Sequence, residues 1–129
     1  MPGSSAELRR GGHLSKRASG AWGEDLALRY LTDRGYQLVE RNYRTRYGEL
    51  DLVLRQGTTL VFVEVKLRRG TGYGDPLEAV TPRKQAAIRS LARQYLAQRA
   101  PAFEDARFDV VGILASGGEP RIVHVEDAF

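Results

Sequence analysis

Hydrophobic and polar residues alternate along two neighbouring stretches of the chain, residues 47–54 and 60–66. A period of two is typical of β-strands, and the turn at residues 55–58 predicts that the two strands pair as a hairpin. On the first strand one predicted face carries Glu49, Asp51 and Val53, and the other carries Leu50, Leu52 and Leu54. On the second, one face carries Leu60, Phe62, Glu64 and Lys66, and the other carries Val61, Val63 and Val65.

Both faces of this hairpin are largely apolar, which predicts a central position with cover on both sides. Asp51, Glu64 and Lys66 are nevertheless charged. Buried charges are costly, so they are usually paired with one another or bound to a metal. From the residues alone, a structural ion-pair cluster is the favoured interpretation. Two carboxylates and an ammonium group are, however, also what a metal-dependent phosphodiester hydrolase needs.

A helical period precedes the hairpin, from about Ser19 to Arg34. Ser19 is the predicted N-cap, and Gly35 is a good helix stop. The apolar stripe consists of Leu26, Ala27, Leu28, Tyr30 and Leu31. Glu24 falls within this stripe, where a capping or snorkelling glutamate and a functional carboxylate are equally well supported.

A second helix is predicted from Thr81 as N-cap and Pro82 at the first helical position to a stop at Pro101. Its apolar stripe is Ile88, Leu91, Ala92, Tyr95 and Leu96. Further strands are expected at residues 36–43, 107–114 and 121–125. The order α-β-β-β-α-β-β predicts an α/β fold, with a mixed sheet and helices packed against it.

Two other segments carry predictions of their own. The glycine-rich residues 68–76 leave directly from Lys66, and we expect a mobile loop that could clamp a charged substrate. His124 has no second histidine near it in the sequence, which favours a surface residue on an edge strand over a metal ligand.

Composition narrows the class of protein. The 129 residues suit one domain, the absence of cysteine excludes disulfides and thiolate metal sites, and no apolar run approaches a membrane span. We therefore expect a cytoplasmic protein. Of the net charge of +4, residues 1–19 contribute +3 and contain few aliphatic residues. Residues 1–18 are predicted to be a disordered basic tail, and residues 19–129 a single domain.

Basic residues also gather near the hairpin and its exits. Charge alone favours an ordinary solvated face, but the same distribution makes several of these residues candidates for nucleic-acid binding. The candidates are Arg44, Arg46, Arg68, Arg69, Arg83 and Lys84.

The series Asp51…Glu64-Val65-Lys66 matches the D…(D/E)-x-K signature of restriction-endonuclease-like nucleases. With Glu24 on the preceding helix, the chain resembles archaeal Holliday-junction resolvases and, more closely, the bacterial YraN family of endonuclease-like proteins. The similar segments are Gly23-Glu24-Asp25-Leu26-Ala27, Gly48-Glu49-Leu50-Asp51-Leu52-Val53, Val63-Glu64-Val65-Lys66 and Glu78-Ala79-Val80. The resemblance covers roughly residues 19–127.

The resemblance implies an αβββαβ core and a catalytic set of Glu24, Asp51, Glu64 and Lys66. Asp51 and Glu64 would be ligands of Mg²⁺ or Mn²⁺, Lys66 would help to activate water, and Glu24 would be an additional acidic group. The role of Glu49 stays open.

The implied function is a metal-dependent DNA endonuclease acting on branched or damaged DNA. The alternatives are a non-catalytic nucleic-acid-binding module with a retained nuclease fold and, more simply, a structural salt-bridge cluster. The expected partner is nucleic acid, with DNA favoured and a membrane excluded. A homodimer is a further expectation, because compact nucleases that make two cuts often dimerise.

Overall fold

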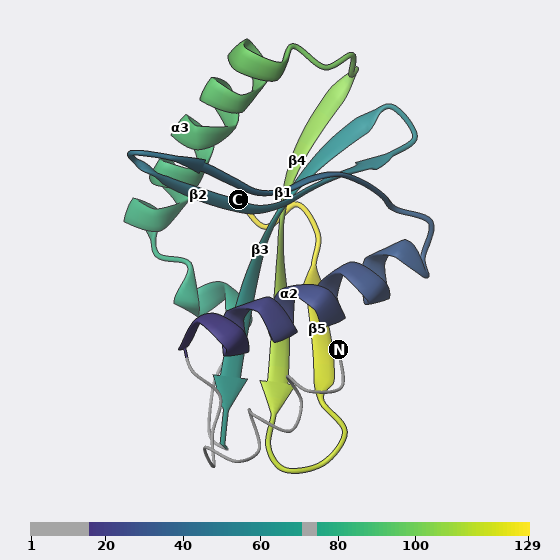
Figure 1. The fold of residues 1–129 in the computed structure, drawn as a ribbon, viewed down its shortest axis with the longest axis vertical. Coiled ribbons are helices and arrows are strands. Elements are labelled where there is room, and N and C mark those ends of the chain that lie inside the picture. The colour runs from purple at the N-terminus through teal and green to yellow at the C-terminus, as the bar shows by residue number, and fades with distance from the viewer. Residues whose placement is uncertain (1–15, 71–74) are drawn as a thin grey trace.

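The computed structural model describes residues 16–70 and 75–129, which fold around one five-stranded mixed sheet of order β1-β2-β3-β4-β5 (Figure 1). β3 and β4 are parallel, and the other neighbouring pairs are antiparallel. The strands are β1 (Gln37–Thr45), β2 (Gly48–Gln56), β3 (Thr59–Arg69), β4 (Asp105–Ala115) and β5 (Arg121–Val125). This arrangement confirms the predicted α/β class and is consistent with a restriction-endonuclease-like core.

Two α-helices cover opposite faces of the sheet. Helix α2 (Lys16–Thr32) packs on β3 and β4, and helix α3 (Pro82–Arg99) packs on β2 (Figure 1). The short 3₁₀ helix η1 (Pro76–Ala79) precedes α3. The predicted caps of α3 are confirmed, since Thr81 Oγ1 accepts a hydrogen bond from the Lys84 N–H at 3.2 Å and Pro82 is the first helical residue. None of the helices in the described ranges is long and apolar enough to cross a membrane.

The core has two parts, one beneath each helix. The α3 side contains Leu60, Phe62, Ile88, Leu91, Ala92 and Tyr95, and the α2 side contains Ala27, Leu31, Val61 and Val63. These groups reproduce the predicted helix stripes and the predicted alternation of β3. The hairpin is therefore central and covered on both faces, as expected for strands that are apolar on both sides.

The alternation predicted for β2 is wrong at Leu50. Leu52 and Leu54 pack on the α2 side, but Leu50 packs with Val53 on the α3 side. The reason is a bend in the neighbouring strand. Leu52 and Leu50 pair with Arg41 and Tyr43, and the residue between these two, Asn42, has a positive φ of 56°. The β1–β2 ribbon therefore turns at this point, and strict alternation does not continue through it.

The same point marks the separation of β2 from β3. Their pairing runs from Gln56↔Thr59 to Leu52↔Val63, and it ends before Asp51. β3 continues beside β4 as far as Arg69, whereas the start of β2 continues beside β1. Asp51 thus lies where the two strands diverge.

The N-terminal end of the domain also differs from the prediction. Helix α2 begins at Lys16, so Ser19 lies inside the helix and is not its N-cap. Lysine, arginine and alanine at positions 16–18 favour helix, which explains the extension. Residues 16–18 of the predicted tail are therefore helical, while residues 1–15 lie outside the described residues. So do residues 71–74 of the loop that was expected to be mobile.

Candidate metal centre

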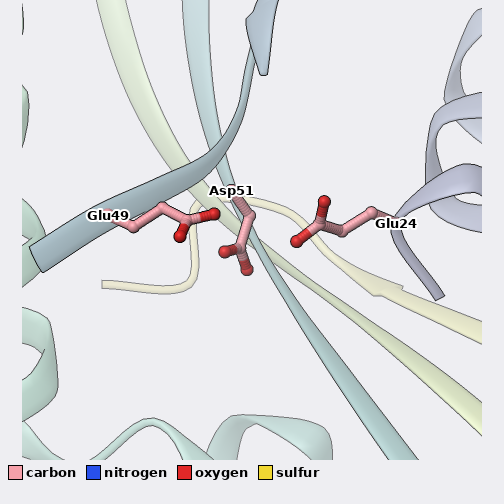
Figure 2. Close-up of side chains that lie close together, drawn as sticks. All are labelled: Glu24, Glu49 and Asp51. Carbon is pink, nitrogen blue, oxygen red and sulfur yellow. The ribbon is translucent and has the colours of Figure 1, made fainter. Parts of the chain in front are cut away.

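Three carboxylate side chains converge where β2 leaves β3. Glu24 comes from α2, and Glu49 and Asp51 come from β2 (Figure 2). One oxygen of each can be chosen so that the three atoms lie within 4.8 Å of one another. Glu24 and Asp51 were predicted site residues, and Glu49 was the residue whose role the sequence left open. The start of β2, beyond the point where it leaves β3, thus brings Glu49 and Asp51 together with an acid from the helix.

Asp51 is the least compensated of these acids. Its Oδ2 accepts a hydrogen bond from the Val65 N–H at 2.9 Å, and in the described part of the chain it forms no ion pair. Burial first, and then the charges of Glu64, Glu24 and Glu49, raise the pKa of Asp51 to about 7 against the opposing effect of the Val65 hydrogen bond. The protein thus holds a carboxyl group that is poised to lose its proton near neutral pH.

Asn42 joins the two glutamates. Its Nδ2 donates to Glu24 Oε1 at 2.9 Å and to Glu49 Oε2 at 2.6 Å. The left-handed backbone of Asn42 turns the amide toward the site, and asparagine adopts this conformation more readily than most residues. The sequence analysis did not identify Asn42. The only available signal was an asparagine within a predicted strand, a position that asparagine seldom occupies.

Two arginines balance the outer carboxylates. Arg41 Nη2 lies 3.5 Å from Glu24 Oε1 and 2.9 Å from Asp25 Oδ1. Arg44 Nε donates to Glu49 Oε1 at 3.0 Å. The compensating positive charge therefore lies on the flanks of the group.

Glu64 lies outside the three-carboxylate group and has cations of its own. Its buried Oε2 lies 3.4 Å from Lys66 Nζ and 3.7 Å from Lys84 Nζ. Its charge is nevertheless the first of those that raise the pKa of Asp51. The predicted Glu64–Lys66 pair is thus present beside Asp51. Lys84, predicted only as a nucleic-acid contact, adds an ion pair from the first turn of α3. The metal-ligand role of Glu64 stays a prediction.

The remaining basic candidates are exposed on the surface. Arg46 and Arg69 have their guanidinium carbons 5.2 Å and 5.7 Å from the ring centroids of Tyr47 and Trp22. Arg68 and Arg83 are exposed. Their contact with nucleic acid stays a prediction.

For His124, the predicted edge strand is confirmed and the predicted surface exposure is wrong. It lies on the edge strand β5, but its side chain is only 8% exposed, and its Nε2 lies 2.7 Å from the fully buried Asp109. Asp109 also receives two hydrogen bonds from Arg107 and one from the Asp127 N–H. The histidine is buried because it completes the hydrogen bonding of an internal carboxylate that sequence spacing does not link to it.

The donor atoms at the three-carboxylate group suit a hard divalent cation. All of them are oxygens, the type that Mg²⁺ prefers and Mn²⁺ accepts, and Mg²⁺ needs only one or two carboxylates because it retains several waters. A cation would also relieve the mutual repulsion that acts on Asp51. The residues present therefore fit such an ion.

Comparison with known proteins places the whole domain in one family. The family model described as "Uncharacterised protein family UPF0102" matches residues 23–113. A UPF0102 protein of Rhodococcus opacus (strain B4) is 55% identical over 113 residues, which cover 87% of this chain and 96% of the relative. One from Rhodococcus jostii (strain RHA1) is 56% identical with the same coverage. A third, from Syntrophomonas wolfei, is 50% identical over 88% of this chain and 98% of the relative. The chain therefore belongs to the UPF0102 family, the YraN family that its segments around Glu24, Asp51 and Glu64 resemble.

Proposed function

We propose that this protein is a metal-dependent DNA endonuclease that hydrolyses phosphodiester bonds, with branched or damaged DNA as its substrates. The observation that carries the proposal is the environment of Asp51. Its carboxyl group is largely removed from water, has two further carboxylates within 4.8 Å, and forms no ion pair within the described residues. Proteins rarely maintain such a concentration of negative charge without a bound cation or a catalytic use for it.

Asp51, with Glu24 and Glu49 beside it, would hold Mg²⁺ or Mn²⁺, and the resemblance adds Glu64 to the ligands. A bound divalent cation supplies polarisation of the phosphodiester and a water molecule of lowered pKa. Asn42 would keep the two glutamates in place through its paired hydrogen bonds.

Lys66 would act on the substrate. Its ammonium group lies 3.4 Å from Glu64, which restricts its position, and its side chain is 24% exposed, so it remains accessible from solvent. From there it can orient the attacking water or stabilise the charge that develops on the phosphate oxygens. Arg83 and Lys84 add positive charge to the first turn of α3, where the helix dipole already favours a phosphate group.

The ion pairs of this region separate the proposal from a purely structural cluster. A structural cluster would be expected to neutralise every acid that it removes from water. Glu64 has two lysines, but among the described residues Asp51 has a backbone N–H as its single partner. This imbalance supports the enzyme over the structural interpretation.

A metal screen on labelled single-stranded, duplex, flapped and four-way DNA tests the proposal. We expect cleavage with Mg²⁺ or Mn²⁺ that EDTA and Asp51→Asn abolish. Asp25→Asn is the matched control, because Asp25 is an exposed acid beside Glu24 that pairs with Arg41. Cleavage that Asp51→Asn leaves intact would contradict the proposal. Binding without cleavage in every metal would identify a non-catalytic nucleic-acid-binding module instead.

Lys66→Ala tests the second part of the mechanism. We expect cleavage to fall about 10²–10⁴-fold while Mn²⁺ binding persists, because charge-stabilising or acid–base groups contribute on this scale. Lys84 still faces Glu64 in this variant, so we expect the protein to stay folded. Single-turnover cleavage and a calorimetric titration with Mn²⁺ measure the two effects. A folded variant that cuts as fast as the parent would exclude a catalytic role for Lys66.

A further inference from the structure

A groove of about 650 Å³ lies between α3 and the turn that joins β1 to β2. Residues 43–47 line one side, and Gln94, Ala97 and Gln98 of α3 line the other. None of these residues is acidic, and two of them, Arg44 and Arg46, are arginines. The volume falls within the range of small-ligand sites in proteins. The groove differs in charge from the acidic centre beside it.

We propose that this groove binds an unpaired base of the DNA substrate. The inference rests on the proposed function only in taking DNA as the ligand. It adds a site that would select DNA with single-stranded segments over continuous duplex.

Tyr47 provides the stacking surface. It is 69% exposed although it is a large aromatic residue, and it lies in the turn between the two strands. The guanidinium carbon of Arg46 lies 5.2 Å from its ring centroid. Aromatic rings and guanidinium planes are the surfaces on which proteins stack unpaired bases. A duplex cannot use them in this way, because its bases are already stacked on one another.

The turn that carries Tyr47 is held by its own hydrogen bonds. Thr45 Oγ1 accepts a hydrogen bond from the Tyr47 N–H at 2.9 Å. Beneath the turn, the Tyr43 ring is buried and packs edge-on against Tyr95 at a centroid distance of 5.1 Å. The groove therefore has a packed aromatic residue on one side, and the backbone that carries the exposed ring is held by a hydrogen bond.

Two amide side chains offer hydrogen bonds to a base edge. The Tyr43 hydroxyl donates to Gln98 Oε1, and no residue that the structure describes accepts a hydrogen bond from the Gln98 amide N–H groups. Within the same described residues, the Gln94 side chain forms no hydrogen bond. Amide groups both donate and accept, so they can recognise base edges of either kind.

Arg44 connects the groove to the carboxylate group. It lines the groove, and its Nε donates to Glu49 at 3.0 Å. A DNA strand whose base occupies the groove would therefore pass over an arginine before it reaches the acidic centre. The arrangement favours cleavage next to an unpaired base.

Binding measurements in EDTA test the inference independently of cleavage. We would measure the fluorescence anisotropy of a labelled DNA duplex with a single-stranded flap, and of the same duplex without the flap. We expect Tyr47→Ala to weaken flap binding about 10-fold, the scale of one lost base–aromatic stack. Duplex binding should change less than about 2-fold, because no stack is lost there. Tyr47→Phe should retain the preference, and Phe103→Ala is the control, since Phe103 is an exposed aromatic residue outside the groove.

Photocross-linking locates the base directly. A flap that contains 5-iodouracil should cross-link to Tyr47, as mapped by mass spectrometry. The inference is overturned if Tyr47→Ala binds the flap as Phe103→Ala does, if it weakens flap and duplex equally, or if the cross-link lies elsewhere. A clear preference for an RNA flap would overturn the assignment to DNA. Selective binding through Tyr47 with no cleavage in any metal would support this inference and contradict the endonuclease proposal.

Discussion

Two aspartates of the sheet, the fully buried Asp109 and the partly buried Asp51, have opposite properties. Asp109 on β4 is fully buried, yet its pKa is lowered. Burial alone would raise it, but hydrogen bonds from His124, Arg107 and the Asp127 N–H outweigh that effect, together with the positive charge of Arg107. Asp51 on β2 is only partly buried by its exposed surface, yet its pKa is raised to about 7, first by its removal from water and then by the charges of Glu64, Glu24 and Glu49. The hydrogen-bond donors and charges beside each carboxylate, and not burial alone, therefore decide whether it is stable as an anion.

The difference separates a structural carboxylate from a candidate functional one. Both oxygens of Asp109 accept hydrogen bonds from Arg107 at 2.9 Å, and His124 Nε2 lies 2.7 Å from Oδ2. That network needs no further ligand. Within the part of the chain that the structure describes, Asp51 has one hydrogen bond and an excess of negative neighbours, so its ionised form requires a further positive partner.

The same isosteric substitution at the two sites should therefore have opposite effects on stability. We expect Asp109→Asn to destabilise the protein by about 3 kcal/mol, because Arg107 and His124 lose their anionic partner inside the fold. Asp51→Asn should be neutral or stabilising in the absence of metal. Urea unfolding of both variants at pH 8 in EDTA measures the contrast. Two destabilisations of similar size would mean that Asp51 is also structural.

The pH dependence of stability sharpens the contrast. An unfolded Asp51 ionises near 3.8, whereas the folded group ionises near 7. Between these values the unfolded chain binds fewer protons, so the free energy of unfolding should fall as pH rises from about 4 to about 7 and then level off. Asp51→Asn has no carboxyl group at this position, so its free energy of unfolding should not show this fall. The difference in free energy of unfolding between the variant and the parent should therefore grow from about pH 4 to about pH 7, to the order of a few kcal/mol.

Asp109 should have the opposite effect on the free energy of unfolding. The stability that it contributes is present above pH 4 and is lost as pH falls through its lowered folded pKa. Melting temperatures of the parent and Asp51→Asn in EDTA, from pH 4 to pH 8, test the first slope. A constant difference between the two proteins would argue against a raised pKa at Asp51. Added Mn²⁺ should stabilise the parent most above pH 7, where the carboxyl group is ionised, and should leave Asp51→Asn unchanged.

The sequence predicted most of the fold, because periodic patterns carry most of the folding information. The stripes of α2 and α3, the caps of α3 and the hairpin turn all follow from repeated spacing or local turn chemistry. The break in alternation at Leu50 was not predictable in this way, because it depends on the left-handed backbone of Asn42 in a neighbouring strand.

In the candidate site, too, some residues follow a sequence pattern and others depend on contacts between separate elements. Asp51, Glu64 and Lys66 could be found because they follow a strand period and match a family signature. Asn42 and the Arg107–Asp109–His124 network could not, because their contacts join separate elements and no period links their positions. The side chains that hold an acid in place are set by tertiary contacts, so they emerge only once the sheet is assembled.

Substitutions of Asn42 should have the smallest effect on stability, and they test the acidic centre selectively. Asn42→Gly keeps a residue that accepts the φ of 56° but removes the amide that joins Glu24 and Glu49. We expect stability to change by less than about 1 kcal/mol, because Arg41 and Arg44 still pair with the two glutamates and the backbone remains unstrained. Mn²⁺ affinity should fall about 10-fold, since residues that orient metal ligands typically contribute at least this much.

Asn42→Ala separates the backbone from the side chain. Alanine loses the same amide but must also adopt a left-handed conformation, so it should bind Mn²⁺ as weakly as Asn42→Gly and unfold more readily by about 1 kcal/mol. Calorimetric titration with Mn²⁺ and urea unfolding of both variants give the two quantities. Unchanged metal affinity in both would mean that Glu24 and Glu49 do not depend on Asn42 for their positions, and the acidic centre would then be ordered by the bound cation itself.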